Sequence, residues 1–212
     1  PEGLAVDASG TIYVADTGNS TIRRITPAGD TSLYAGFPGS SGVANGPALF
    51  GATFYHPMSV SLDSSGNVFV GDTFNHRIRK ITTLGAVSTL AGDSTQFNDI
   101  WDSTIDASGN IYAADGNNRR GRKISKSGFI NTFATGIFAW RVAATPSGTV
   151  YATESGSIVY KITSAGAVSV YAGSVSNKGS TNGTGTAARF SAPEGVAIDA
   201  NGNVFVADTA NH

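Results

Sequence analysis

Two tryptophans, an arginine, three acids and a methionine stand at corresponding positions of a segment that recurs along the chain. These residues are Glu2, Met58, Trp101, Asp102, Trp140, Arg141 and Glu194. Tryptophan and methionine offer apolar contact area, whereas the carboxylates and the guanidinium offer charge. This combination is typical of a mixed aromatic and polar pocket for a small molecule or for the end of a peptide. We therefore interpret the seven residues as candidate ligand-binding residues.

The histidines raise the question of a metal site, because a catalytic zinc commonly takes three protein ligands and keeps one position open. His76 and His212 occupy the same place in the recurring segment, which indicates a structural role, and only His56 lacks that explanation. Calcium would need oxygen ligands from several segments. The weak metal candidates are His56, Asp102 and Glu194, and the convergent oxygen ligands for calcium are Glu2, Asp102 and Glu194. The sequence predicts no cofactor, with zinc or calcium as the alternative.

The composition and the motifs exclude several other classes of protein. The chain has no Cys, which removes disulfide frameworks, thiolate metal sites and cysteine nucleophiles. It contains neither a G-x-S-x-G nucleophile elbow nor a phosphate-binding G-x-x-x-x-G-K motif. No apolar run approaches the roughly 20 residues that a membrane span needs, so we expect none.

The charges do not favour a nucleic acid partner. The chain has 14 Lys and Arg against 15 Asp and Glu, a formal net charge of -1. Ten of the 14 basic residues cluster in expected third strands or just before them: Arg23, Arg24, Arg77, Arg79, Lys80, Arg119, Arg120, Arg122, Lys123 and Lys161. An acid ends the preceding strand in each copy, so pairs of Arg and Asp across neighbouring strands explain the cluster. RNA binding is accordingly the weakest functional alternative.

The elements that must position these side chains are predicted by an internal repeat. The segment that begins at residue 3 recurs near residues 59, 103, 142 and 195. Its apolar runs are short, rich in Val, Ile and Tyr, and bounded by Gly and Asp, which predicts strands. A tight turn with a side-chain acceptor first and a glycine fourth, such as Asp7–Gly10, is followed by a second one, such as Thr26–Gly29. Each whole copy is therefore expected to form a four-stranded antiparallel meander.

Such a sheet has apolar residues on both faces and buries them only against neighbouring sheets. Stacking around an axis predicts an all-β protein, a β-propeller of four-stranded antiparallel blades, with four full blades plus the first half of a fifth. A parallel solenoid is the rival, but its repeats are shorter and lack paired hairpin turns. The expected organisation of the single region 1–212 is blade 1 (1–36), a long link (37–56), blade 2 (57–92), blade 3 (99–136), blade 4 (139–173), a long link (174–192) and a half-blade (193–212).

The residues after two of the second strands resemble a known repeat. Asn75 and His76 follow the sequence Val-x-Asp-Thr, and Asn211 and His212 follow VFVADTA, which is similar to the NHL repeat and its Asn-His-Leu signature. The stretch 172–195 resembles the long connection between blades of bacterial NHL propellers. The resemblance covers essentially the whole chain and implies a ring of about six blades.

Blades 3 and 4 depart from the family pattern, with Trp101 and Trp140 in segments where Pro-x-Gly is expected and with Gly156 and Ser157 in place of Asn-His. The chain holds four and a half blades and stops just after a second strand. We expect it to be a portion of a larger ring, or a second copy or another chain to complete the ring. A closed five-bladed ring is the weaker option.

The loop-bearing face of the disc is the expected location of the site, because binding groups concentrate on loops held by a rigid scaffold. The links 37–56 and 174–192 fall there, together with Trp101 and Trp140 at the mouth of the central channel. The tryptophans could instead serve as a plug for the channel. The leading interpretation is a non-catalytic module that binds a protein, a peptide or a small molecule, in a secreted or cell-surface bacterial protein. The alternative is a metal-assisted lyase or lactonase at the channel mouth, an activity that the resemblance implies for some NHL-like enzymes.

Overall fold

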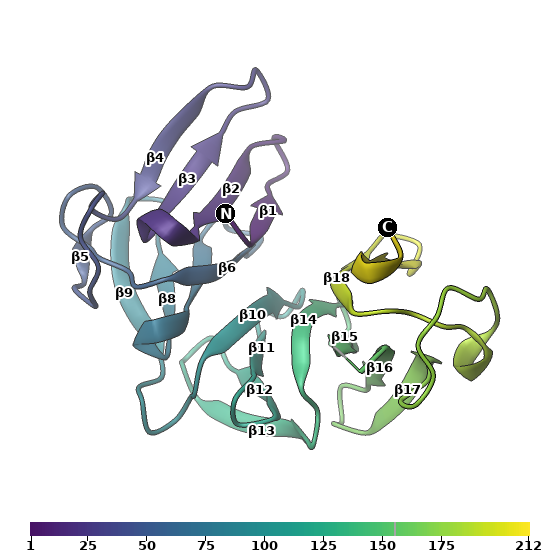
Figure 1. Ribbon diagram of the computed structural model, residues 1–212. Coiled ribbons are helices and arrows are strands. Elements are labelled where there is room, and N and C mark those ends of the chain that lie inside the picture. Colours follow the sequence, from purple (N-terminus) through teal and green to yellow (C-terminus); the bar gives the residue numbers. More distant parts are fainter. Residues whose placement is uncertain (155) are drawn as a thin grey trace.

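The computed structural model describes residues 1–154 and 156–212, and its regular elements are strands and short 3-10 helices. Four antiparallel meanders follow one another along the chain, and a two-stranded sheet follows the fourth. Figure 1 shows these sheets as the blades of an open arc, with the two termini on either side of the opening. The all-β propeller that the sequence predicts is therefore confirmed.

Each blade runs from an inner to an outer strand in chain order. Blade 1 contains β1 (Leu4–Val6), β2 (Ile12–Asp16), β3 (Thr21–Ile25) and β4 (Thr31–Ala35). Blade 2 contains β6 (Pro57–Leu62), β7 (Val68–Asp72), β8 (Arg77–Ile81) and β9 (Ala86–Ala91). Blade 3 contains β10 (Ile100–Ile105), β11 (Ile111–Asp115), β12 (Arg120–Ile124) and β13 (Ile130–Thr135). Blade 4 contains β14 (Ala139–Ala144), β15 (Val150–Glu154), β16 (Ile158–Ile162) and β17 (Val168–Gly173).

The half-blade contains β18 (Pro193–Ile198) and β19 (Val204–Asp208). Short 3-10 helices follow three of the second strands or lie in a link: η1 (Thr17–Asn19), η2 (Thr73–Asn75), η3 (Gly185–Ala187) and η4 (Thr209–Asn211). No helix within the described ranges has the length and the apolar composition to cross a membrane.

The tight turns have the geometry that their sequences predict. Gly10 and Gly29 have φ angles of 83° and 91°, a region that residues with a Cβ rarely adopt. In the first turn the Gly10 N–H donates to the Asp7 carbonyl at 3.0 Å, and the Asp7 carboxylate accepts the Ser9 N–H at 2.8 Å. These turns place the hairpins of each blade on one face and leave the links between blades on the other.

The link between blades 1 and 2 adds a strand to blade 2. Within it, β5 (Gly46–Pro47) pairs antiparallel with β9, and the resulting sheet has the order β5-β9-β8-β7-β6. Next to this pair, the Ala48 N–H donates to the Gly85 carbonyl at 2.7 Å. The link thus covers part of the outer edge of blade 2, where strand backbone would otherwise stay unpaired.

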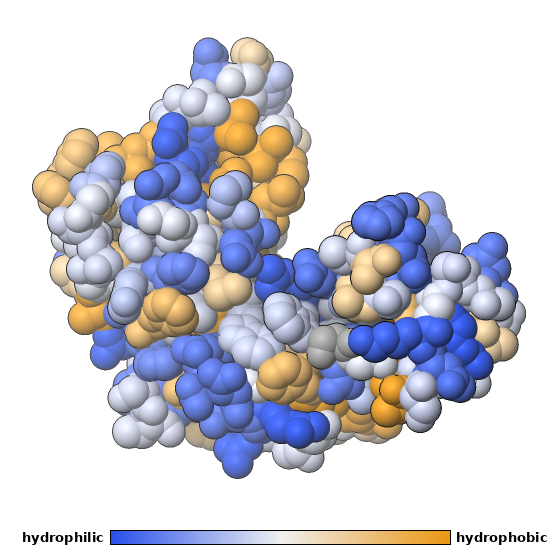
Figure 2. All heavy atoms as spheres, viewed as in Figure 1, coloured by the Kyte–Doolittle hydropathy of each residue, from blue (hydrophilic) through white to orange (hydrophobic). Residues whose placement is uncertain are grey.

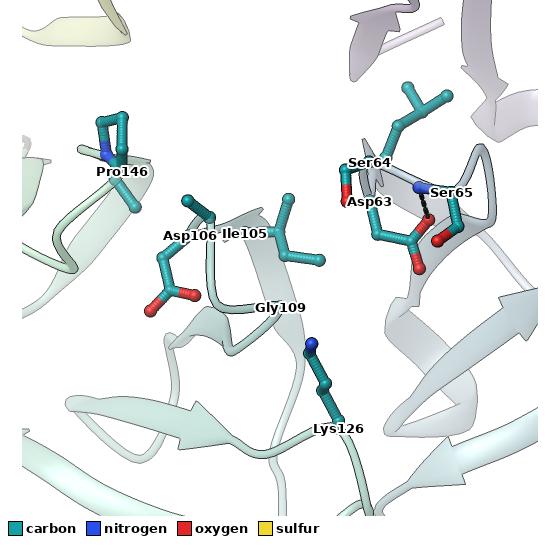
Figure 3. A pocket seen from close by; sticks show the side chains of 11 residues that line it. Asp63, Ser64, Ser65, Ile105, Asp106, Gly109, Lys126 and Pro146 are labelled. Atoms are coloured by element: carbon teal, nitrogen blue, oxygen red, sulfur yellow. Dashed lines mark hydrogen bonds between the residues drawn. The ribbon is translucent and has the colours of Figure 1, made fainter.

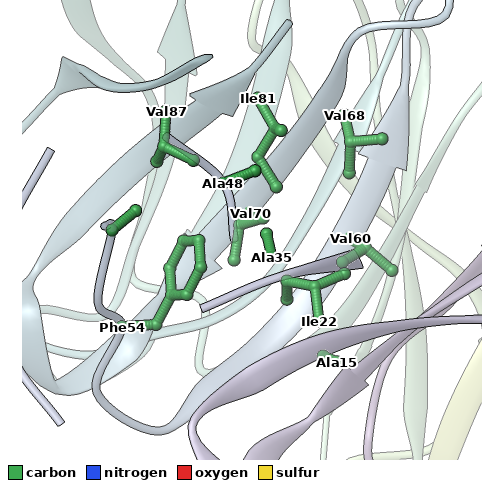
Figure 4. Close-up of a cluster of buried hydrophobic side chains, with 11 residues drawn as sticks. Ala15, Ile22, Ala35, Ala48, Phe54, Val60, Val68, Val70, Ile81 and Val87 are labelled. Carbon is green, nitrogen blue, oxygen red and sulfur yellow. The ribbon is translucent and has the colours of Figure 1, made fainter. Parts of the chain in front are cut away.

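Apolar side chains between neighbouring sheets hold the blades together. The cluster between blades 1 and 2 consists of Ala15, Ile22 and Ala35 from blade 1, Val60, Val68, Val70, Ile81 and Val87 from blade 2, and Ala48, Ala52 and Phe54 from the link (Figure 4). Further clusters join blade 2 to blade 3 and blade 3 to blade 4. Because each blade uses one face for the preceding blade and the other for the next, the stability of each depends on its neighbours.

Blade 1 and the half-blade each keep one apolar face without a neighbouring blade. Leu4 in β1 is 66% exposed, whereas Val60 at the corresponding position of β6 is 5% exposed. Phe205 in β19 is 58% exposed, whereas the corresponding Phe69 in β7 is 5% exposed. Figure 2 shows apolar surface on blade 1 next to the notch that separates it from the half-blade.

The Asp that ends the second strand and the Asn three residues later hold the link that precedes the same blade. In blade 2 the Asp72 carboxylate accepts the Tyr55 N–H at 2.7 Å, and the Asn75 amide donates to Asp72 at 2.8 Å and to the Gly42 carbonyl at 2.7 Å. In the half-blade, Asp208 and Asn211 make the same set of contacts with the link 174–192. The repeated residues therefore fasten the links to the disc.

The histidine position of the repeat joins blade 1 to blade 2 and blade 2 to blade 3. His76 Nδ1 lies 3.2 Å from the Asp99 backbone N–H and accepts its hydrogen bond. In blade 1 the same position is Ser20, whose hydroxyl accepts the His56 N–H at 3.3 Å. This position thus connects the second strand of one blade to the residue just before the inner strand of the next.

Candidate functional site

The inner strands of all five sheets line a central channel. The cavity there has a volume of about 290 Å³ and is lined by residues of β1, β6, β10, β14 and β18. Between blades 3 and 4, the Asp102 carboxylate accepts the Val142 N–H at 2.8 Å, and the Thr104 hydroxyl accepts the Ala144 N–H at 3.3 Å. Short polar side chains and strand backbone thus form a wall that is fixed by the packing of the blades.

Three aromatic side chains gather at the mouth of the channel on the loop face. The ring centroids of Trp101 and Trp140 lie 5.2 Å apart, and Phe138 packs edge-on against Trp101 at 4.8 Å. Gly116 lies beneath the Trp101 ring, which a Cβ at that position would overlap. The structure thus brings together the two tryptophans that the sequence singled out. Phe138 joins the two tryptophans in the structure. Its sequence position indicates this location, because it comes just before an inner strand that lacks the Pro-x-Gly expected of the NHL repeat.

An ion pair crosses the mouth of the channel. Glu2 from blade 1 and Arg141 from blade 4 are 139 residues apart in sequence, yet Glu2 Oε2 and Arg141 Nη2 lie 2.9 Å apart. Arg141 Nη1 donates to the backbone carbonyls of Trp101 and Trp140 at 3.2 and 3.3 Å. The guanidinium is therefore held by the backbone of the two residues that carry the aromatic rings.

Asp102 lies in the channel wall beside this pair. Removal from water raises the pKa of Asp102 to about 6, against the opposing effects of the Val142 N–H and of the Arg141 charge. A carboxyl group with such a pKa exchanges its proton near neutral pH, which is the property of a general acid or base. Among the candidate residues, Asp102 is thus the one with chemistry beyond binding.

The other candidates do not join this group. Glu194 is exposed, and its backbone carbonyl accepts the Thr153 hydroxyl at 2.7 Å. Met58 is half-buried next to Gly3. His56 lies at the link and stacks on Phe74, with ring centroids 4.5 Å apart. In residues 1–154 and 156–212, no three His, Asp or Glu side chains come together as metal ligands do.

A pocket of about 320 Å³ opens beside His56. Blade 1 and the link supply its lining: Gly18, Asn19, Ser20, Gly39, Ser40, Ser41, Tyr55 and His56. The link 37–56 thus contributes polar groups to this pocket.

A further cavity of about 290 Å³ lies on the opposite face, among the first turns of blades 2, 3 and 4. Ala144 takes the place of the larger Leu62 and Ile105 of the preceding blades, and this smaller side chain leaves the space open. Figure 3 shows the Lys126 side chain directed into the cavity between the turns that carry Asp63 and Asp106. Sequence reasoning did not predict this cavity, although Ala144 breaks the pattern of large apolar residues there.

Comparison with protein families identifies the repeat. The model of the NHL repeat matches residues 1–25 and 190–212, which are the first three strands of blade 1 and the half-blade with the end of its link. No curated protein sequence matches the chain at a significant level.

Solved structures match almost the whole chain. Virginiamycin B lyase from Staphylococcus aureus matches 98% of this chain with a TM-score of 0.68 and 15% identity, and the chain covers 63% of that protein. A gluconolactonase from Xanthomonas campestris matches 97% of the chain with a TM-score of 0.71 and 12% identity, over 68% of its own length. A chain of the nidogen/laminin complex matches 98% with a TM-score of 0.73 and 17% identity, over 71% of its length.

At these identities the matches show the fold, and the chain spans less than two thirds of the lyase. The blades, the Asp and Asn contacts with the links and the matching family model lead to one conclusion: this chain folds as a β-propeller, and its first blade and its half-blade are NHL repeats.

Proposed function

We propose that this chain is a non-catalytic binding module whose site is the loop-face mouth of the central channel. The observation that carries the proposal is the pairing of Glu2 with Arg141 directly beside the aromatic cluster of Trp101, Trp140 and Phe138. Aromatic rings supply apolar contact area at low entropic cost, and the charged pair supplies orientation. A peptide or a small molecule with an apolar group and a charge fits this combination.

The two tryptophans provide the test, because they are the only ones in the chain and both belong to the cluster. Titration with a panel of short peptides is expected to change the tryptophan emission and to give a saturable heat of binding. Replacement of both Trp101 and Trp140 by Leu is expected to abolish binding in calorimetry. Binding of unchanged affinity to the double variant would show that the site lies elsewhere.

A metal-assisted lyase or lactonase at the same mouth is the second candidate. It is favoured by the raised pKa of Asp102 and by the likeness of the fold to a virginiamycin B lyase and to a gluconolactonase. Its test is metal analysis of the purified protein: stoichiometric zinc or calcium that is lost in the Asp102→Asn variant supports the enzyme. Binding of a ligand without metal and without turnover supports the binding module.

The two open faces of the arc support a proposal about partners, namely that each docks a further blade of the NHL type. Arg79 in blade 2 is fully buried beneath its link, whereas the corresponding Arg23 in blade 1 has a 40% exposed side chain. The likeness to a chain of the nidogen/laminin complex adds support for protein contacts. The mass in solution tests this proposal: a stable monomer of 21.6 kDa contradicts it, and a larger assembly that dissociates in the Phe205→Glu variant supports it.

A further inference from the structure

The channel mouth already contains a carboxylate, and that carboxylate is the side chain of Glu2. We infer that the site recognises the free carboxylate of a peptide C-terminus with an apolar last side chain, and that Glu2 is the internal competitor that such a peptide displaces from Arg141. The inference rests on the proposed binding function and specifies the class of ligand.

Arg141 is prepared to bind an anion before any ligand arrives. Its Nη1 donates to the carbonyls of Trp101 and Trp140, which fixes the plane of the guanidinium, and its Nη2 remains directed at the Glu2 carboxylate. Arginine keeps its charge at every physiological pH, and its planar fork matches the geometry of a carboxylate. Hydrogen bonds between a charged donor and a charged acceptor are about twice as strong as neutral ones.

Glu2 is a weak occupant of this place. A single carboxylate oxygen contacts Arg141 within hydrogen-bond distance, and the Glu2 side chain is 37% exposed. Ion pairs at such exposure contribute little, because water screens them and because both side chains lose freedom when they pair. A ligand that adds contacts elsewhere in the mouth can therefore replace Glu2 at Arg141.

The aromatic cluster supplies those additional contacts. Trp101 and Trp140 are the two residues whose backbone carbonyls accept from Arg141, and their rings pack against each other. An apolar group close to a carboxylate bound at Arg141 is therefore expected to contact these rings. In a peptide C-terminus, the last side chain stands one carbon from the carboxylate. A Glu side chain within a peptide places its carboxylate farther from the backbone and presents no apolar group beside it.

The experiment compares three probes by tryptophan emission and by calorimetry: N-acetyl-leucyl-phenylalanine, its C-terminal amide, and N-acetyl-glutamyl-glycine amide. We expect the free acid to bind at least about tenfold more tightly than either amide, the gain of one charge-assisted hydrogen bond. The Glu2→Gln variant is expected to bind the free acid about threefold to tenfold more tightly than the wild type, because the competitor is gone.

The variant Glu194→Gln is the matched control, since Glu194 occupies the same repeat position in the half-blade and makes no side-chain contact with Arg141. It is expected to leave the affinity unchanged. Arg141→Met is expected to remove the preference for the acid over the amide. If that variant does not unfold cooperatively, Arg141→Lys decides, because it retains the charge but not the fork, and it is expected to weaken binding of the acid.

The outcomes separate the two proposals. Equal affinity of the free acid and its amide overturns the carboxylate inference and leaves binding at the mouth intact. Tighter binding of the internal Glu probe overturns the assignment to a C-terminus. Absence of binding of all three probes to both the wild type and the Glu2→Gln variant overturns the inference, and the proposed function then stands or fails on the wider ligand panel.

Discussion

The Asp72 carboxylate and the Arg79 guanidinium lie 2.8 Å apart, and both side chains are inaccessible to solvent. Arg79 also donates to the carbonyls of Ala44 and Thr53, at 2.8 and 3.1 Å, which are both in the link between blades 1 and 2. Burial raises the pKa of Asp72, and the Tyr55 N–H, the Asn75 amide and the Arg79 guanidinium oppose this effect. The pair therefore fastens the link to blade 2.

Replacement of Arg79 by Met should be strongly destabilising. The change leaves a buried carboxylate without its partner, for which a loss of about 3 to 5 kcal/mol in the free energy of unfolding is expected. Urea denaturation measures this loss. The matched control is Arg23→Met, because Arg23 lies 3.9 Å from Asp16 and is 40% exposed, and its effect is expected to stay below about 1 kcal/mol. Similar losses in the two variants would contradict the role of burial.

Replacement of Asn75 by Ala should release the link. The Asn75 amide donates to the Gly42 carbonyl, and its loss leaves that acceptor without this hydrogen bond, at a cost of about 1 to 2 kcal/mol. Limited proteolysis is expected to cut the link 37–56 faster in this variant. Asn19→Ala serves as the control, because the Asn19 amide contacts only Asp16 among the described residues. Unchanged cleavage in the Asn75 variant would show that the amide does not restrain the link.

The stability of the protein should depend on the protonation of Asp102. Its pKa of about 6 in the folded state exceeds its ordinary value of 3.8, so folding takes up a proton between these values. The corresponding stabilisation is complete below pH 3.8 and is lost as the pH rises through 6. Relative to Asp102→Asn, the wild type is expected to lose at most about 3 kcal/mol between pH 3.5 and pH 7, judged from roughly 1.4 kcal/mol per pKa unit.

Urea denaturation of both proteins across this range measures the difference, because the titration of every other group cancels between them. The variant keeps an oxygen that accepts the Val142 N–H. A wild-type stability that runs parallel to that of the variant from pH 3.5 to pH 7 would show that the Asp102 carboxyl group is not desolvated as the structure indicates.

Alanine substitutions at two turn glycines distinguish the cost of backbone strain from the cost of a steric clash between blades. Gly29 and Gly128 have similar φ angles, 91° and 87°, but a Cβ at Gly29 meets open space whereas a Cβ at Gly128 overlaps the Leu90 carbonyl of the preceding blade. Gly29→Ala is expected to cost about 1 kcal/mol. Gly128→Ala is expected to cost roughly 1 to 3 kcal/mol more, because the blades must move apart. Thermal unfolding of the two variants checks this, and equal costs would contradict the close approach.

Much of the fold followed from local residue chemistry. Turns such as Asp7–Gly10 need an acceptor first and a glycine with positive φ fourth, and the alternating apolar residues between the turns suit strands buried on both faces. Because each repeated sheet is apolar on both faces, it needs neighbouring sheets, and stacking around an axis supplies them. The pairing of Asp16 with Arg23, of Asp72 with Arg79 and of Asp115 with Arg122 also agrees with the sequence, because the residues lie on adjacent strands of one hairpin.

The sequence by itself determined the blades, their turns and the set of side chains that begin the inner strands. Tertiary structure alone decided which of these side chains meet. Glu2 reaches Arg141 and Glu194 does not, although both occupy the same repeat position. The physical reason is that contacts across the channel depend on the packing distances and rotations summed over several blades, and no residue pattern within one blade specifies that sum.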